Sequence, residues 1–256
     1  MKKLLFVAYA LLFCAGLAAA QSGDFEIEDG VLVKYRGDAA EVRVPDSVTR
    51  IGHIAFSYNS KLVSITIPAS VTSIGNAPFS YCSELTAIRV DQGNPAYTDR
   101  DGILFTKDLT ALICYPRKKT ASSYRVPAGV TTIGPDAFAG CGGLVSITLP
   151  AGLTTIGDSA FNGSGLKTLT IPNSVTVIGG YAFYGCKNLA EIVLPAGLTE
   201  IGAFTFYECA KLAKMAIPVT VQKIGSGAFY RCNSLPSATL AMIREKFGED
   251  PFFMGF

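Results

Sequence analysis

The chain has 256 residues, of which 49% are hydrophobic and 16% are charged, and its formal net charge is +2. This composition excludes an intrinsically disordered chain, which combines few apolar residues with a high net charge. It also removes the electrostatic basis for nucleic-acid binding, which requires a clear excess of Lys and Arg. A single His and the absence of Trp narrow the catalytic options.

Residues 1–20 have the pattern of an export signal. Two lysines precede an apolar run that is too short to span a bilayer comfortably, and three alanines suit cleavage after Ala20. We therefore expect an exported protein that starts at Gln21 and has no transmembrane segment. It would be periplasmic, associated with the cell surface or secreted. A lipoprotein signal at Cys14 is a weaker alternative, because Phe13 is a poor residue beside the cleaved bond.

Residues 21–44 are expected to form a β-hairpin that caps the N-terminus. Asp29-Gly30 is a favourable pair for a tight hairpin turn, and apolar residues alternate after it. Asp101-Gly102 begins a similar run within residues 91–126, a 36-residue insertion in the repeat pattern described next. We interpret the two segments as related hairpins, one capping the chain and one inserted within the stack.

A motif that begins with proline recurs seven times in residues 45–240, mostly at intervals of 22 or 23 residues. Each copy has an aliphatic residue three after the proline, Ile-Gly at six and seven, and Phe at eleven. The residues before the next proline alternate in polarity, as in Leu62–Ile67, which indicates a strand with one buried face. The motif starts at Pro45, Pro68, Pro127, Pro150, Pro172, Pro195 and Pro218.

A unit of this length cannot bury its own apolar side chains, whereas stacked units cover one another. We therefore predict a repeat solenoid with one continuous core. Parallel strands such as Ile147–Leu149 form a sheet on the concave face, and the Ala-Phe segments form short helical or 3-10 turns opposite. Residues 241–256 are expected to cap the last repeat with a short helix that ends at Gly248, followed by an aromatic tail. The tail residues expected to cover the core are Phe252, Phe253, Met254 and Phe256.

The pattern Ile-Pro-x-x-Val-Thr-x-Ile-Gly-x-x-Ala-Phe-x-x-Cys-x-x-Leu resembles the BspA-like leucine-rich repeats of bacterial surface proteins. The resemblance extends from about Phe25 to Leu240, nearly all of the exported chain. It implies a leucine-rich-repeat solenoid and attachment to host or bacterial surface proteins, such as matrix glycoproteins. It specifies the fold subclass more strongly than the function, because one fold hosts many functions.

Five cysteines share the position fourteen after the proline. Equivalent side chains in a parallel stack lie about 4.8 Å apart with parallel Cβ vectors, whereas a disulfide needs Cβ atoms about 3.8 Å apart and angled together. We therefore predict buried free thiols that pack as small apolar groups, with no metal bound. The five are Cys82, Cys141, Cys186, Cys209 and Cys232.

Nothing in the sequence indicates an active site. His53 occupies a variable loop position, and no Ser/His/Asp set or phosphate loop is present. Glu41 and Glu191 are the two carboxylates at outward strand positions, and over about 20 Å of stacked strands separates them. We therefore predict no catalytic residues, no cofactor and no metal site.

The outward strand positions form a candidate recognition surface for a protein partner, because solenoids use extended faces for binding. Three arginines lie toward its N-terminal half and hydroxyl side chains fill much of the rest, although Ser and Thr are also ordinary strand residues. The predicted partner-binding residues are Arg43, Ser64, Thr66, Arg89, Arg125, Ser146, Thr148, Thr168 and Thr170. A second candidate stripe is Tyr184, Tyr207 and Tyr230, which drift between duplicated repeats would also explain.

Three further hypotheses stay open. Arg36-Gly37-Asp38 resembles an integrin-recognition tripeptide, although Gly-Asp is also a common turn pair. A periplasmic or envelope scaffold that binds an endogenous partner is an alternative to a surface adhesin. A carrier of a hydrophobic small molecule is a third possibility.

Overall fold

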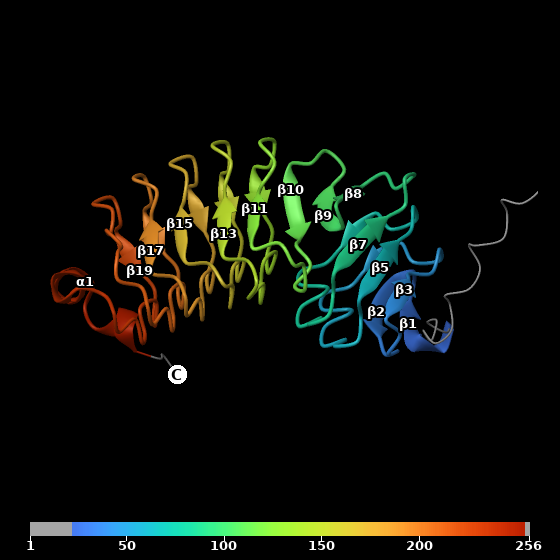
Figure 1. Cartoon of the computed structure of the whole chain (residues 1–256), viewed down its shortest axis with the longest axis horizontal. Coiled ribbons are helices and arrows are strands. Elements are labelled where there is room, and N and C mark those ends of the chain that lie inside the picture. Colours follow the sequence, from blue (N-terminus) through green and yellow to red (C-terminus); the bar gives the residue numbers. More distant parts are fainter. Residues whose placement is uncertain (1–21, 254–256) are drawn as a thin grey trace, which may run out of the picture.

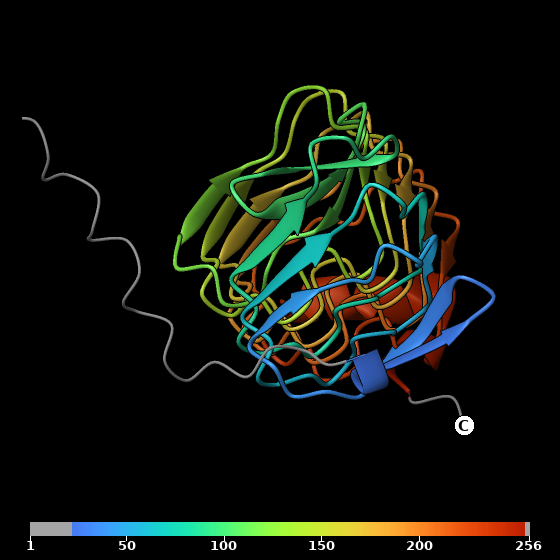
Figure 2. The same ribbon diagram turned by 90° about the vertical axis from the view of Figure 1, so that its right-hand side faces the viewer.

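The computed structural model describes residues 22–253, which wind into a stack of turns between an N-terminal hairpin and a C-terminal helix (Figure 1). Figure 2 looks along the stack and shows successive turns superposed around a shared interior. The predicted repeat solenoid is therefore confirmed.

One strand of each turn lies at the end of a repeat and pairs in parallel with a neighbouring strand, as predicted. Arg43 is opposite Thr66 and Thr66 is opposite Arg89, so equivalent residues align in columns across the strands. Inward residues such as Val42 and Ile65 are buried, as the alternating pattern requires. These strands, which we call the main ladder, are β3 (Glu41–Arg43), β5 (Ser64–Ile67), β7 (Ala87–Val90), β11 (Ser123–Arg125), β13 (Ser146–Thr148), β15 (Thr168–Thr170) and β17 (Glu191–Val193).

Each repeat also has a second, two-residue strand that sequence analysis did not predict, ending at the Ile of the Ile-Gly pair. The following Gly is required by close approach: a Cβ on Gly75 would lie 2.7 Å from the backbone nitrogen of His53 in the preceding turn. The second ladder consists of β4 (Arg50–Ile51), β6 (Ser73–Ile74), β12 (Thr132–Ile133), β14 (Thr155–Ile156), β16 (Val177–Ile178), β18 (Glu200–Ile201) and β19 (Lys223–Ile224).

The Ala-Phe segments form hydrogen-bonded turns, and we call this side of the solenoid the turn face. The N–H of Asn59 donates to the carbonyl of Phe56, three residues earlier, at 3.2 Å. Successive turns are also bonded to each other, for example Phe56 N–H to Pro78 O at 2.8 Å. These bonds satisfy backbone groups that would otherwise be buried without partners.

The N-terminus begins with η1 (Ser22–Asp24), followed by the antiparallel pair β1 (Phe25–Glu28) and β2 (Val31–Tyr35). The turn residues Asp29 and Gly30 have φ values of 47° and 75°, as the favoured Asp-Gly hairpin turn requires. β2 then pairs in parallel with β4, so the hairpin starts the second ladder.

The insertion contributes three antiparallel strands, β8 (Tyr97–Arg100), β9 (Ile103–Thr106) and β10 (Ala111–Cys114). β10 pairs in parallel with β12 as β2 does with β4. The N–H of Tyr115 donates to the carbonyl of Ala137 in the next turn at 2.8 Å, as the N–H of Tyr35 donates to the carbonyl of Ala55 at 2.9 Å. The counterpart of the β1–β2 hairpin is therefore β9–β10. The sequence comparison matched Asp29-Gly30 with Asp101-Gly102, which joins β8 to β9, and so chose the hairpin before the true counterpart.

The expected single core is divided in two at β9. Leu104 packs into a cluster that contains repeats one and two, whereas Ile103 and Phe105 pack into the cluster that contains the later repeats. Successive side chains of a strand point to opposite sides, so β9 forms a partition between the clusters. A series of ring contacts, which we call the ring stack, runs through each cluster, from Phe25 to Phe79 with tilted rings and from Tyr115 to Phe229 with nearly parallel rings, and neighbouring centroids lie 5.0–5.5 Å apart. The stack members are Phe25, Tyr35, Phe56 and Phe79, then Tyr115, Phe138, Phe161, Phe183, Phe206 and Phe229.

The C-terminal end is covered by α1 (Ser237–Phe247) and η2 (Asp250–Phe252). The helix starts four residues earlier than expected and ends at Gly248, whose φ is 76°. Pro251 is buried, and its carbonyl accepts the N–H of Phe229 at 2.8 Å, in place of the carbonyl that the next repeat supplies to earlier Phe residues such as Phe206. Phe253 is 60% exposed and does not cover the core as expected. Met254 and Phe256 lie outside the described residues.

Candidate protein-binding face

The outward side chains of the main ladder form one surface, which we call the strand face. Its columns are in register: Ser64 is opposite Ala87, Ser146 follows Ser123, and Arg125 is opposite Thr148. The structure therefore brings the predicted arginine and hydroxyl side chains onto one side of the solenoid. The face changes in chemical character along its length.

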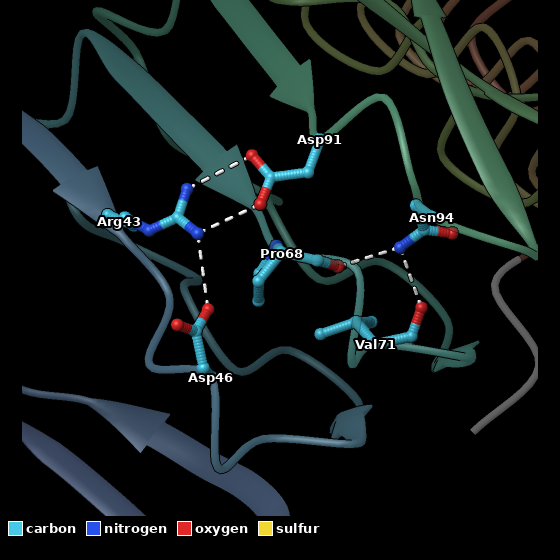
Figure 3. Close-up of polar contacts among 6 residues, drawn as sticks. All are labelled: Arg43, Asp46, Pro68, Val71, Asp91 and Asn94. Atoms are coloured by element: carbon cyan, nitrogen blue, oxygen red, sulfur yellow. Dashed lines mark hydrogen bonds and ion pairs between the residues drawn. The ribbon is translucent and has the colours of Figure 1, made fainter.

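At its N-terminal end, the strand face is occupied by internal ion pairs. The guanidinium of Arg43 donates to both carboxylate oxygens of Asp91, at 3.0 and 2.8 Å, and to Asp46 at 3.1 Å (Figure 3). The bidentate bond holds the pKa of Asp91 below its ordinary value. Sequence analysis missed both aspartates, because neither is at an outward strand position of its own repeat.

Asn94 anchors the start of the insertion beside this ion pair (Figure 3). Its side-chain amide is buried and donates to the carbonyls of Pro68 and Val71 at 2.7 and 2.9 Å. Its side-chain oxygen accepts the N–H groups of Ala96 and Tyr97. The first two bonds tie the segment after Asp91 to repeat two, which keeps Asp91 within reach of Arg43, and the other two hold the local turn of the insertion.

The other two arginines differ from each other. Arg89 lies 3.5 Å from the carboxylate of Asp99, which belongs to the insertion and also accepts the N–H of Val90. Arg125 is exposed and has no ion pair with another described residue. The expected basic half of the face is therefore largely neutralised, and Arg125 is its available cation.

The middle of the strand face carries exposed hydroxyl side chains. Ser146, Thr148, Thr168 and Thr170 are exposed on β13 and β15. Small hydroxyl side chains donate and accept hydrogen bonds with little ordering cost, which suits contact with a protein surface.

At its C-terminal end the face opens into an apolar groove. In the next repeat, the segment beside β17 forms a single β-bridge, between Lys214 and Glu191, and the side chains of these two residues lie 3.6 Å apart. Between the two preceding strands, β15 and β17, the N–H of Ile171 donates to the carbonyl of Val193 at 3.0 Å. The equivalent bond from Leu194 N–H to Ala216 O is absent among the described residues, so the two segments separate there. The groove measures about 550 Å³ and is lined by Glu191, Ile192, Val193, Leu194, Ala196, Lys214, Met215, Ala216, Pro218 and Val219.

Two valines make this groove unusual for a solvent-facing surface. Val193 is 48% exposed and Val219 is 92% exposed. Val219 lies directly after a repeat proline, where the other repeats have Asp, Ala or Asn, so the sequence carried a signal for this patch. Exposed apolar groups bordered by polar ones are typical of interaction sites.

The predicted tyrosine stripe lies in the turn segments, away from the strand face. Tyr184, Tyr207 and Tyr230 stack with centroids 4.6 and 4.8 Å apart, and Arg231 covers the Tyr230 ring. Tyr207 is only 7% exposed, so the stack contributes mainly to packing between turns. A more exposed pair was not predicted: Tyr58 and Tyr81 stack at 4.7 Å.

The tripeptide Arg36-Gly37-Asp38 has a structural explanation. Arg36 pairs with Glu26, and Asp38 pairs with Lys61 at 2.7 Å. A Cβ on Gly37 would lie 2.6 Å from the Cζ of Tyr35, so the glycine is required by packing. Both charged side chains are therefore already engaged within the protein.

The cysteine column forms a series of thiol hydrogen bonds. All five column thiols are buried, and each donates to the carbonyl of the aromatic residue one turn earlier; for Cys82 and Phe56 the distance is 3.1 Å. Burial raises the pKa of Cys82, Cys141 and Cys232 to about 12. The six cysteines within residues 22–253 are free, and that part of the chain contains no His/Cys/Asp/Glu cluster able to hold a metal.

His53 is exposed, and its Nδ1 is paired with the carbonyl of Asn76 at 2.8 Å. Glu41 and Glu191 lie at opposite ends of the strand face, on β3 and β17. The structure does not bring these titratable residues together. No helix within the described part of the chain is long and apolar enough to cross a membrane.

The fold and its face define a leucine-rich-repeat solenoid. The chain matches the BspA type leucine rich repeat region in 6 copies, over residues 34–100 and 114–249. It therefore belongs to the BspA-type leucine-rich-repeat family. Proteins of this family and fold are typically non-catalytic interaction modules.

Solved structures of bacterial leucine-rich-repeat proteins are similar to this chain. One from Eubacterium ventriosum is 25% identical, with a TM-score of 0.57 over 78% of each chain. A leucine rich cell surface protein from Faecalibacterium prausnitzii is 28% identical, with a TM-score of 0.59 over 86% of this chain and 62% of its own. A T. pallidum leucine-rich-repeat protein is 25% identical, with a TM-score of 0.50 over 89% and 95%. No curated protein matched the chain.

Proposed function

We propose that this protein is an exported, non-catalytic module that binds another protein through the strand face between β11 and the groove after β17. Attachment to host or bacterial surface or matrix proteins is the role we infer. The observation that carries the proposal is the open apolar groove with Val193 and Val219 exposed at its rim.

The proposed surface combines the elements of a protein interface. The groove supplies apolar area for a buried centre, the hydroxyl columns supply hydrogen bonds, and Arg125 supplies an unpaired guanidinium. Arg43, Ser64, Thr66 and Arg89 continue the same face, but the ion pairs of the two arginines must be broken before either can bind a partner carboxylate. We therefore assign these four residues a flanking role.

The surface location is supported by the export signal pattern of residues 1–20 and by the cell surface protein among the similar structures. A periplasmic scaffold remains the alternative. Protease treatment of intact cells separates the two, because a surface protein is digested and a periplasmic one is protected. A carrier of a hydrophobic molecule is less favoured, because the buried aliphatic and aromatic side chains fill the stack interior.

The proposal is tested by measuring binding of the protein from Gln21 onward to a panel of matrix, serum and bacterial surface proteins in 0.15 M salt. Arg125→Glu is expected to weaken saturable binding at least about tenfold, the loss typical of an interface cation that becomes a like charge. Lys187→Glu, an equal charge change on an exposed turn residue, is the matched control and is expected to bind normally. Equal loss in both variants would contradict the assigned face, and silence across the panel would contradict the adhesin role.

A further inference from the structure

The stack is interrupted between repeat two and the insertion. We call this boundary the seam; residues 77–82 lie on one side of it and residues 113–117 on the other. The main ladder ends at β7 on the N-terminal side and resumes at β11, and the second ladder ends at β6 and resumes at β10. Strand pairing also stops between β13 and β15 and between β16 and β18, but there the turn-face bonds continue, as from Phe161 N–H to Ala182 O and from Phe183 N–H to Thr205 O. The division of the core at β9 falls at the seam.

The turn-face hydrogen bonds also stop at the seam. In repeat one, the N–H groups of Ile54, Phe56 and Tyr58 donate to the next turn at 3.2, 2.8 and 3.0 Å. Within residues 22–253, the equivalent N–H groups of repeat two have no hydrogen-bond partner. They belong to Ala77, Phe79 and Tyr81.

Side-chain packing is incomplete at the same boundary. Phe79 ends one ring stack and Tyr115 begins the next, without a ring contact between them. A cavity of about 20 Å³ lies between the two sides. Tyr115 lines this cavity, and its buried hydroxyl has no hydrogen-bond partner in the described structure. Every other pair of neighbouring repeats in the described chain has a ring contact, so the ring stack is interrupted at the seam.

A short segment nevertheless ties the two sides together. The hairpin β8–β9 inserts Leu104 into the N-terminal cluster, and Gly102 O accepts the N–H of Ile88 at 2.9 Å. The Tyr97 hydroxyl accepts the N–H of Ile74 at 2.9 Å, and Leu85 O accepts the N–H of Lys118 at 2.8 Å. Ile113 and Cys114 also pack against the N-terminal cluster, and Arg117 lies over the Tyr81 ring at 5.7 Å. These contacts act as a strap across a junction that lacks the turn-face bonds and the ring contact found between other repeats.

From these observations we infer that the seam is a hinge that divides the protein into two cooperative units, residues 22–90 and residues 103–253, joined by the strap. In a solenoid, cooperativity passes only through contacts between neighbouring turns. A weak junction therefore lets one unit open while the other stays folded. Opening at the seam changes the angle between the Arg43–Arg89 part of the strand face and the Arg125-to-groove part. This inference goes beyond the proposed function and does not depend on it.

Hydrogen–deuterium exchange of the full protein with peptide resolution tests the hinge. Val48→Ala and Val175→Ala are matched substitutions, because both residues are buried and lie three after a repeat proline. Val48→Ala is expected to speed exchange at least about tenfold in residues 31–90 and less than about twofold in residues 130–235. Val175→Ala is expected to give the reverse pattern.

Equal acceleration of both regions by either variant would overturn the hinge. If a variant fails to fold, the unmodified protein supplies the same test in increasing urea. Two groups of amides, divided at the seam, should then show different free energies of opening and different urea dependences. A single value shared by both regions would mean one cooperative unit and would overturn the inference.

Discussion

The guanidinium of Arg43 and the carboxylate of Asp91 face each other in a bidentate ion pair, although 48 residues separate them in the chain. The pair joins the first strand of the main ladder to the residue after β7, across β5. It holds the first three strands together at one edge and occupies a cation that the sequence pattern had assigned to partner binding.

Asp91→Asn is expected to lower the free energy of unfolding by less than about 1 kcal/mol at pH 7, because the pair is partly solvated. Arg43 lowers the folded pKa of Asp91, so the pair's contribution is complete above the unfolded pKa of about 3.9 and is lost as the pH falls through the lower folded value. Urea unfolding at pH 7 and at low pH measures this. A difference that persists at low pH, or that 1 M salt does not reduce, would argue against the ion pair as its cause.

The ring stack predicts a large cost for removing one of its members. Phe161→Ala is expected to destabilise the protein by about 3–5 kcal/mol, because the ring is fully buried between Phe138 and Phe183. Phe253→Ala is the control, with an expected change below about 0.5 kcal/mol, since that side chain is mostly exposed. Similar costs for the two variants in urea unfolding would contradict the role of the stack.

The glycine of the Ile-Gly pair is required by the neighbouring turn. A Cβ on Gly157 would lie 2.7 Å from the backbone nitrogen of Pro135, so Gly157→Ala is expected to cost about 1–3 kcal/mol. A Cβ on Gly197 would have no atom within 4 Å, so Gly197→Ala should be neutral or slightly stabilising. Thermal melting of the two variants compares these outcomes. Equal melting temperatures would contradict close approach as the reason why glycine follows Ile in every repeat.

The buried thiols predict a sharp difference between folded and unfolded protein. Protein from Gln21 onward is expected to give six free thiols when titrated in guanidinium. In the folded state the column cysteines should react slowly at pH 8, because burial shields them and raises the pKa of three of them to about 12. Two or fewer thiols in the denatured protein would show that disulfides form and would contradict this account.

Much of the fold could be predicted because the repeat is a local pattern. The proline, Ile-Gly and Phe positions recur at nearly constant spacing, so they specify one strand per turn and a stacked core. The second ladder was missed because strands of two residues are too short to show alternation. The division of the core was missed because β9 is buried on both sides, and Ile103, Leu104 and Phe105 form a continuous apolar run without a side preference.

The candidate site was less predictable because it depends on contacts between distant residues. Alternation placed Arg43, Arg89 and Arg125 on one face correctly, but pairing with Asp91 and Asp99 depends on where the insertion lies against repeat two. The groove depends on the divergence of the last strand from β17, which no single repeat encodes. Val219 was the available sequence signal, since the residue after the repeat proline is Asp, Ala or Asn in every other repeat.

The central claim is that the groove end of the strand face binds a protein. For a partner found in the binding panel, the decisive measurement is its affinity for Val219→Asp compared with Tyr58→Ser, a change at an exposed side chain on the turn face. The account predicts that Val219→Asp weakens binding at least about tenfold with little change in melting temperature, while Tyr58→Ser binds normally. Normal binding by Val219→Asp together with loss in Tyr58→Ser would contradict it and would place the interface on the turn face.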